Sequence, residues 1–146
     1  MIEPLIFSSS LLLGKEIAAQ TITSTTKNIY NGIDKILLND NVHFKKILDD
    51  LDINTKLDII HTFIIDFHKD IKLFNETITK TIKYLENSLK TIEIEIENIN
   101  NELEIHSTKW FNRYRSSNCS ELLNNLINHV KILDNRFELF IKLIKI

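Results

Sequence analysis

Glycine and proline are almost absent from this sequence. Its 146 residues include two glycines, Gly14 and Gly32, and one proline, Pro4, so that residues 33–146 contain neither. Folds rich in β-structure need a turn roughly every 8–12 residues, and such turns depend on glycine and proline. The shortage also excludes the glycine-rich loops that bind phosphate groups and dinucleotides. We therefore expect an all-α protein.

Cysteine is equally scarce. Cys119 is the single cysteine, so an internal disulfide cannot form, which favours an intracellular, reducing compartment such as the cytoplasm or a virion. The spacings HExxH, CxxC, GxSxG and EF-hand do not occur, and no group of polar residues has a spacing that demands catalysis. We expect a protein that is not an enzyme and that has no cofactor and no metal.

Neither charge nor hydropathy points to a membrane protein. The 18 Lys and Arg residues nearly balance the 20 Asp and Glu residues, and the formal net charge of −2 gives no general reason to expect nucleic acid as a partner. No apolar run reaches the roughly 18–20 residues that span a bilayer. The apolar stretch 5–13 follows Glu3 instead of a basic region, so we expect no secretory signal.

Isoleucine, asparagine and lysine are abundant instead. The sequence contains 26 Ile, 16 Asn and 15 Lys, but 2 Ala and 3 Arg. The abundant residues have AT-rich codons, whereas Ala, Gly, Pro and Arg mostly have GC-rich codons. This bias indicates an AT-rich genome, such as that of a large DNA virus, a protist or a reduced bacterium.

Hydrophobic spacing predicts helices along the whole chain. The first covers about residues 4–38, and Gly14 or Gly32 is expected to mark a kink in it. A short helix over about 42–51 is expected to end at a group of aspartates, because the helix dipole disfavours acidic side chains at a C-terminus. Thr55 is a suitable N-cap for the next helix.

The strongest signal is a heptad-like pattern with one four-residue step near Ile78. Its apolar residues are Leu57, Ile60, Ile64, Phe67, Ile71, Phe74, Ile78, Ile82, Leu85, Leu89, Ile92, Ile96, Ile99 and Leu103. An unbroken helix of about 50 residues would be a rod roughly 75 Å long; the pattern leaves open whether the helix over 55–106 is continuous or kinked near Ile78. Residues 91–97 also alternate like a β-strand, but the helical spacing continues through them, so we predict helix there.

A last helix is predicted from about Cys119 to Lys145, again with a heptad pattern. Residues 78–105 and 119–146 are equally long, and this equality predicts an antiparallel hairpin. The hairpin either protrudes as an arm or belongs to one elongated bundle.

The predicted fold is one all-helical domain over residues 1–146, an elongated helical bundle with a long heptad-bearing central helix. It comprises an N-terminal helical part, 1–77, and a coiled-coil-like antiparallel C-terminal hairpin, 78–146.

His61 and His68 are the first candidates for a chemical role. They lie seven residues apart on one helix face, with Asp58 nearby, and imidazole and carboxylate groups bind zinc or iron. Histidines at this spacing are about 10 Å apart along the helix, which is too far for one ion. We therefore expect both to flank the core and to pair with neighbours.

Cys119 lies near a predicted helix N-terminus, which favours a thiolate. The sequence indicates no base beside it, so we expect Cys119 to be a small buried hydrophobic residue.

The most distinctive segment is the basic-aromatic corner, residues 109–115. It contains Trp110, Phe111, Arg113, Tyr114 and Arg115. Such side chains anchor protein interfaces, stack on bases and pair with phosphates, or close the end of a helical bundle. The glutamates of residues 86–104 form an acidic stripe, which is either a solvated helix flank or a surface that pairs with this corner on another protomer.

These features predict a structural or protein-interaction protein whose partner is a second copy or another helical protein. The outer side of the hairpin remains apolar at Tyr84, Ile94, Ile105, Leu122, Ile132 and Ile141, which favours a dimer. The codon bias fits a small virion or scaffold component of a large DNA virus. The alternative is a helical module that binds nucleic acid through residues 109–115 or a membrane surface through its apolar ends, 5–13 and 137–146.

Overall fold

The computed structural model of the protein describes residues 3–38, 42–69, 75–107 and 116–145. Within these ranges only the backbone is described for residues 3–18, 42–43, 68, 106–107 and 116–119. The described residues form the helices α1 (Glu3–Leu37), α2 (Val42–Leu51), α3 (Ile53–His68), α4 (Glu76–Ser107) and α5 (Ser116–Ile144). The predicted all-α fold is confirmed, and residues 91–97 are helical.

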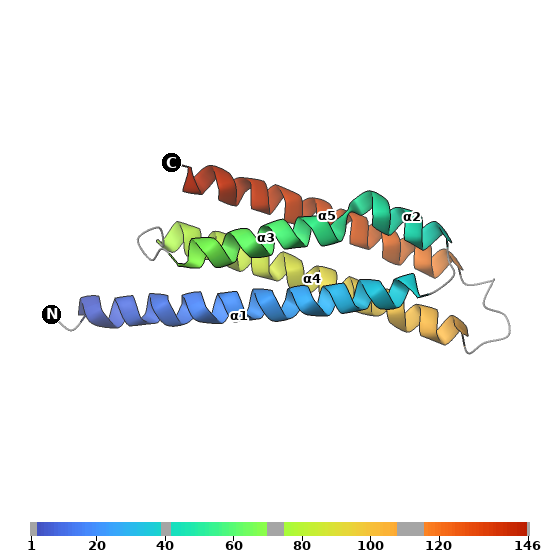
Figure 1. Ribbon diagram of the computed structural model, residues 1–146, viewed down its shortest axis with the longest axis horizontal. Coiled ribbons are helices and arrows are strands. Elements are labelled where there is room, and N and C mark those ends of the chain that lie inside the picture. Colours follow the sequence, from blue (N-terminus) through green and yellow to red (C-terminus); the bar gives the residue numbers. More distant parts are fainter. Residues whose placement is uncertain (1–2, 39–41, 70–74, 108–115, 146) are drawn as a thin grey trace.

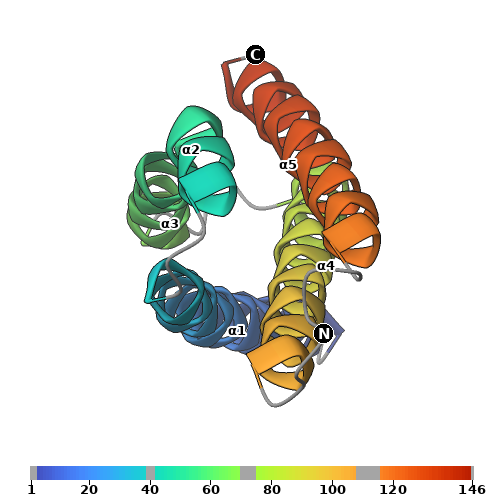
Figure 2. The ribbon, with the colours of Figure 1, turned by 90° about the vertical axis from the view of Figure 1, so that its right-hand side faces the viewer.

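The helices form two layers, one of which is the hairpin of α4 and α5 (Figure 1, Figure 2). In this hairpin His129 lies beside Glu95, and the Arg136 guanidinium lies over the Tyr84 ring. Residues further along α5 therefore lie beside earlier residues of α4, which means that the two helices are antiparallel. The antiparallel C-terminal hairpin is confirmed.

The second layer consists of α1 and the column formed by α2 and α3 (Figure 2). The Thr23 hydroxyl is 2.9 Å from His61 Nε2, and the Tyr30 hydroxyl donates to the Asn54 carbonyl at 3.4 Å, so α1 and α3 are antiparallel. The chain passes from α2 to α3 at Asp52, whose φ of 49° lies in the left-handed region.

α1 joins the layers by packing parallel to α4. Asn28 donates to Glu93 at 3.4 Å, and Asn100 donates to the Gly32 carbonyl at 3.0 Å. At Gly32 the two helices approach so closely that a Cβ atom there would lie 2.5 Å from Ile96 Cγ2. The role of Gly32 is thus close packing, and α1 runs as one helix through both of its glycines.

α3 packs parallel to α5 on the other side of the bundle. Lys56 forms an ion pair of 3.0 Å with Asp134, and the Phe63 ring meets Phe137 and Phe140 edge-on at centroid distances of 5.8 and 5.9 Å. Because α1 lies along α4 and α3 lies along α5, the hairpin is one layer of an elongated bundle.

The heptad positions form the core, as predicted. On α3 and α4 the buried members are Leu57, Ile60, Ile64, Phe67, Ile78, Ile82, Leu85, Leu89, Ile92, Ile96 and Ile99. On α5 they are Leu123, Leu126, Val130, Leu133 and Phe140, and α1 contributes Ile22, Ile29, Ile33 and Ile36. One apolar face per helix therefore supplies the interior.

Residues 55–106 do not form one continuous helix. α3 ends at His68 and α4 begins at Glu76, so the rod is divided close to the four-residue step at Ile78. Asn75 caps the new helix, because its Oδ1 accepts a hydrogen bond of 2.9 Å from the Ile78 amide.

Two predicted helix starts were too late. α3 begins at Ile53 and not at Thr55, because the left-handed turn at Asp52 directs Ile53, 3% exposed, into the core. α5 begins at Ser116, three residues before Cys119. Within the described ranges, no helix is long and apolar enough to cross a membrane.

Candidate interaction surface

The predicted site lies outside the described residues. This applies to Trp110, Phe111, Arg113, Tyr114 and Arg115. The basic-aromatic corner therefore stays a prediction.

His61 pairs with a neighbouring side chain, as predicted, through its contact of 2.9 Å with Thr23. The side chains of His68 and Cys119 are outside the described part. Among the side chains that the structure describes, no three His, Cys, Asp or Glu residues are grouped to hold a metal ion.

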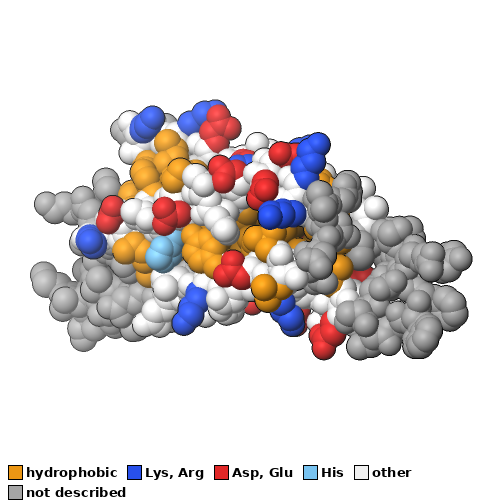
Figure 3. Space-filling model, turned by 45° about the vertical axis from the view of Figure 1, so that its right-hand side comes forward, with side chains coloured by type: hydrophobic (Ala, Val, Ile, Leu, Met, Phe, Trp, Pro, Cys, Tyr) orange, Lys and Arg blue, Asp and Glu red, His pale blue; other side chains and the backbone are white. Residues whose placement is uncertain are grey.

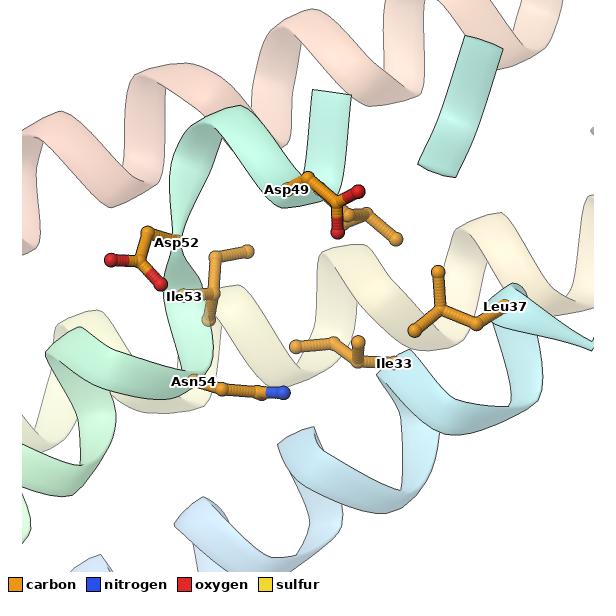
Figure 4. A pocket seen from close by; sticks show the side chains of 7 residues that line it. Ile33, Leu37, Asp49, Asp52, Ile53 and Asn54 are labelled. Carbon is orange, nitrogen blue, oxygen red and sulfur yellow. The ribbon is translucent and has the colours of Figure 1, made fainter. Parts of the chain in front are cut away.

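A small pocket lies where α1, α2 and the start of α3 meet, with a volume of about 140 Å³. Ile33 and Leu37 point toward Ile53 across it, whereas the Asp52 carboxylate points away (Figure 4). Its lining combines four apolar residues with three polar ones, Asp49, Asp52 and Asn54, and the carboxylate of Asp49 lies at its edge. No basic side chain belongs to this lining.

A second, shallow depression beside the corner between α2 and α3 is lined by residues that carry polar groups. These are Tyr30, Asp34, Asn54, Thr55 and Asp58. Burial raises the pKa of the Tyr30 hydroxyl, and the nearby Asp58 carboxylate raises it further.

The hairpin carries several exposed hydrophobic side chains. Of eight large ones that are exposed in the described part, five belong to α4 and α5: Tyr84, Ile94, Ile105, Ile132 and Leu139. The sequence predicted four of them, while Leu122 and Ile141, also expected on the outer side, are half-buried. Leu139 was not anticipated.

One contact between the hairpin helices, that of Arg136 with Tyr84, is flanked on α5 by two exposed hydrophobic residues. We call these four side chains the seam patch: Tyr84, Ile132, Arg136 and Leu139. The guanidinium of Arg136 is 5.6 Å from the Tyr84 ring centroid, and its Nη1 donates to the Tyr84 carbonyl at 2.9 Å and to Ser88 Oγ at 2.8 Å. Ile132, Arg136 and Leu139 follow at i, i+4 and i+7, which places them on one face of α5.

Sequence reasoning overlooked Arg136. Arg136 lies between Ile132 and Leu139 at helical spacing. This spacing was the signal in the sequence that could have assigned Arg136 to the same face of the helix. Its position beside a tyrosine of another helix depends on the register of the hairpin. Within the described part, Arg136 contacts no carboxylate.

The acidic stripe is partly built into the bundle and not wholly solvated. Glu86 is 6% exposed, Glu93 accepts a hydrogen bond from Asn28, and Glu95 Oε1 lies 3.7 Å from His129 Nε2. On the side formed by α1, α2 and α3, acidic and basic side chains are interspersed around patches of hydrophobic ones (Figure 3).

Comparison with known proteins gives one informative similarity. The chain is 28% identical over 89 residues to an uncharacterised protein of Acanthamoeba polyphaga mimivirus, and the match covers 61% of this chain and 43% of that protein. The chain thus matches less than half the length of this relative. No protein-family model matches the chain, and neither does any solved structure. The similarity is consistent with a viral origin, which is one of the three AT-rich sources that the codon bias leaves open.

Proposed function

We propose that the protein is a non-enzymatic helical protein that associates with itself through the outer face of α4 and α5. In this proposal it is a small structural or scaffold component of a large DNA virus. The observation that carries the proposal is the exposure of Tyr84, Ile94, Ile132 and Leu139 on one layer, beyond the core-facing heptad side chains. Aromatic and arginine side chains concentrate binding energy at protein interfaces, and the seam patch contains both.

The viral part of the proposal is supported by two observations that do not depend on the surface. The composition indicates an AT-rich genome, and the relative is a mimivirus protein.

Light scattering after size-exclusion chromatography tests self-association. We expect a mass of about twice 17.1 kDa at micromolar concentration, and a constant mass of 17.1 kDa would reject the proposal. Ile94→Lys should yield monomers, because it places a charge in the proposed contact. Ile59→Lys is the matched control: Ile59 is also 55% exposed but lies on α3, and the dimer should persist.

The basic-aromatic corner has its own test. A dimer that is unchanged in a protein with Trp110→Ala and Tyr114→Ala would exclude this corner from the contact. Binding of DNA or RNA that weakens with salt and is lost with Arg113→Ala and Arg115→Ala would favour the alternative of a nucleic-acid-binding module.

A further inference from the structure

Charge is distributed unevenly along the hairpin of α4 and α5. Residues 76–90 of α4 and 131–144 of α5 contain six basic and four acidic side chains. Residues 91–107 of α4 and 116–130 of α5 contain six glutamates and neither Lys nor Arg. Residues 108–115, which connect them in sequence, add Lys109, Arg113 and Arg115, so that residues 91–130 together still carry an excess of negative charge. Because the two helices are antiparallel, the two basic halves lie together at one end of the hairpin, which we call the basic end. The two acidic halves lie together at the other end, which we call the acidic end.

The surplus of positive charge at the basic end persists after local ion pairing. Three of the four acidic residues there are engaged by lysines of the same end: Glu76 by Lys80 at 3.5 Å, Glu86 by Lys83 at 3.7 Å and Glu138 by Lys142 at 3.9 Å. The fourth, Asp134, forms its ion pair with Lys56 of α3. Lys90 and Lys131, both exposed, and the half-buried Arg136 add charge to this end.

The change of sign coincides with the exposed hydrophobic centre of the hairpin. It falls between residues 90 and 91 of α4 and between 130 and 131 of α5. Ile94 lies four residues beyond this boundary on α4, and Ile132 two residues beyond it on α5. The contact of Glu95 with His129 places these two isoleucines at nearly the same level, within about one helical turn.

We propose that a second copy of the chain binds antiparallel to this face, across a two-fold axis that passes near Ile94 and Ile132. This orientation places the acidic end of each copy over the basic end of the other, and Arg136 of each copy at the level of residues 97–104 of its partner. A parallel arrangement would place like charges together, which is unfavourable. A two-fold axis also lets each hydrophobic centre pack on its own copy, as in isologous dimers. The inference rests on the self-association proposed above.

Charge reversal at exposed positions tests the orientation. The basic-end variant carries Lys90→Glu and Lys131→Glu, the acidic-end variant carries Glu97→Lys and Glu121→Lys, and the double-end variant carries all four changes. All four side chains are exposed, so the fold should tolerate the changes. Circular dichroism checks that each variant remains helical, and Lys27→Glu with Asp34→Lys on α1 is the control for charge changes elsewhere.

Antiparallel pairing predicts a distinctive pattern. Each single-end variant should raise the dimer dissociation constant about tenfold, because both contacts become like-charged. The double-end variant should regain the wild-type constant, because reversal of both ends restores opposite charges. The α1 control should leave the constant unchanged.

Mixing wild-type and double-end proteins distinguishes the orientations further. Native mass spectrometry with isotope-labelled wild type should show two homodimers and few heterodimers, because mixed antiparallel pairs bring like charges together. Preferred heterodimers would indicate parallel pairing, and statistical mixing would show that charge does not set the orientation; both results overturn this inference while self-association stands. Monomers for all proteins, wild type included, would instead reject the proposed function.

Discussion

The side-chain amide of Asn100 on α4 donates a hydrogen bond of 3.0 Å to the carbonyl oxygen of Gly32 on α1. Asn100 is 8% exposed, so this contact satisfies a polar side chain that would otherwise be costly to bury. The contact is possible because Gly32 has no side chain and the backbones approach closely there. This small site joins the two layers of the bundle.

Replacing Gly32 by alanine should destabilise the protein. The new Cβ would lie 2.5 Å from Ile96 Cγ2, so the buried Ile96, which is 2% exposed, would have to shift. Overpacking of this kind costs about 1–3 kcal/mol, which should exceed the gain of up to about 1 kcal/mol in helix propensity. Thermal unfolding followed by circular dichroism measures the net loss. Asn31→Ala, at an exposed position of the same helix, is the control, and a Gly32→Ala protein that melts at a higher temperature would contradict the close approach.

Leu89→Asp and Leu133→Asp should each unfold the hairpin or sharply lower its stability. Both leucines are at most 1% exposed, and an unpaired carboxylate in their place costs several kcal/mol. Urea unfolding gives the change, with the exposed Asn98→Asp and Asn128→Asp as controls for added charge. An unchanged midpoint for Leu89→Asp or Leu133→Asp would mean that this face is not buried.

Two neighbouring isoleucines on α3 provide a matched pair. Ile60 is 2% exposed and Ile59 is 55% exposed. Ile60→Ala should lower the free energy of unfolding by about 2–5 kcal/mol because it leaves a cavity. Ile59→Ala should change it by no more than about 0.5 kcal/mol. Equal effects of the two substitutions would show that α3 is rotated from the orientation described.

Tyr30 should ionise at higher pH than an ordinary tyrosine. Burial and the Asp58 carboxylate raise its pKa above the usual 10.0, so the folded state holds this proton more tightly than the unfolded state does. The resulting contribution to stability is complete below pH 10.0 and is lost as the pH rises through the folded-state pKa.

Ultraviolet absorbance of tyrosinate measures this ionisation. Titration of the folded protein should contain a late component that is missing from Tyr30→Phe and from the protein unfolded in urea. A Tyr30→Phe titration that keeps the late component would assign it to another tyrosine.

The sequence alone determined the helical class, the buried face of each helix and the antiparallel hairpin. The lack of glycine and proline after Gly32 leaves few places for turns, and apolar residues at three- and four-residue intervals mark one side of a helix whatever it packs against. For this reason the spacing of Leu89 is enough to predict that it belongs to the core. The equal lengths of the two last heptad segments were also visible in the chain itself.

The tertiary structure decided how these helices meet. The heptad pattern continues through Ile71 and Phe74, and its four-residue step near Ile78 left open whether the helix is interrupted. The end of α3 at His68 and the cap at Asn75 are recognised only from the structure, the cap from its hydrogen bond to the Ile78 amide.

The partners of each helix were likewise undetermined, since an apolar stripe fits any other apolar stripe. The pairings of Gly32 with Asn100 and of Arg136 with Tyr84 join residues far apart in sequence. Such pairings depend on the register between whole helices. Local spacing does not determine this register, because it is set by packing over the full length of the bundle.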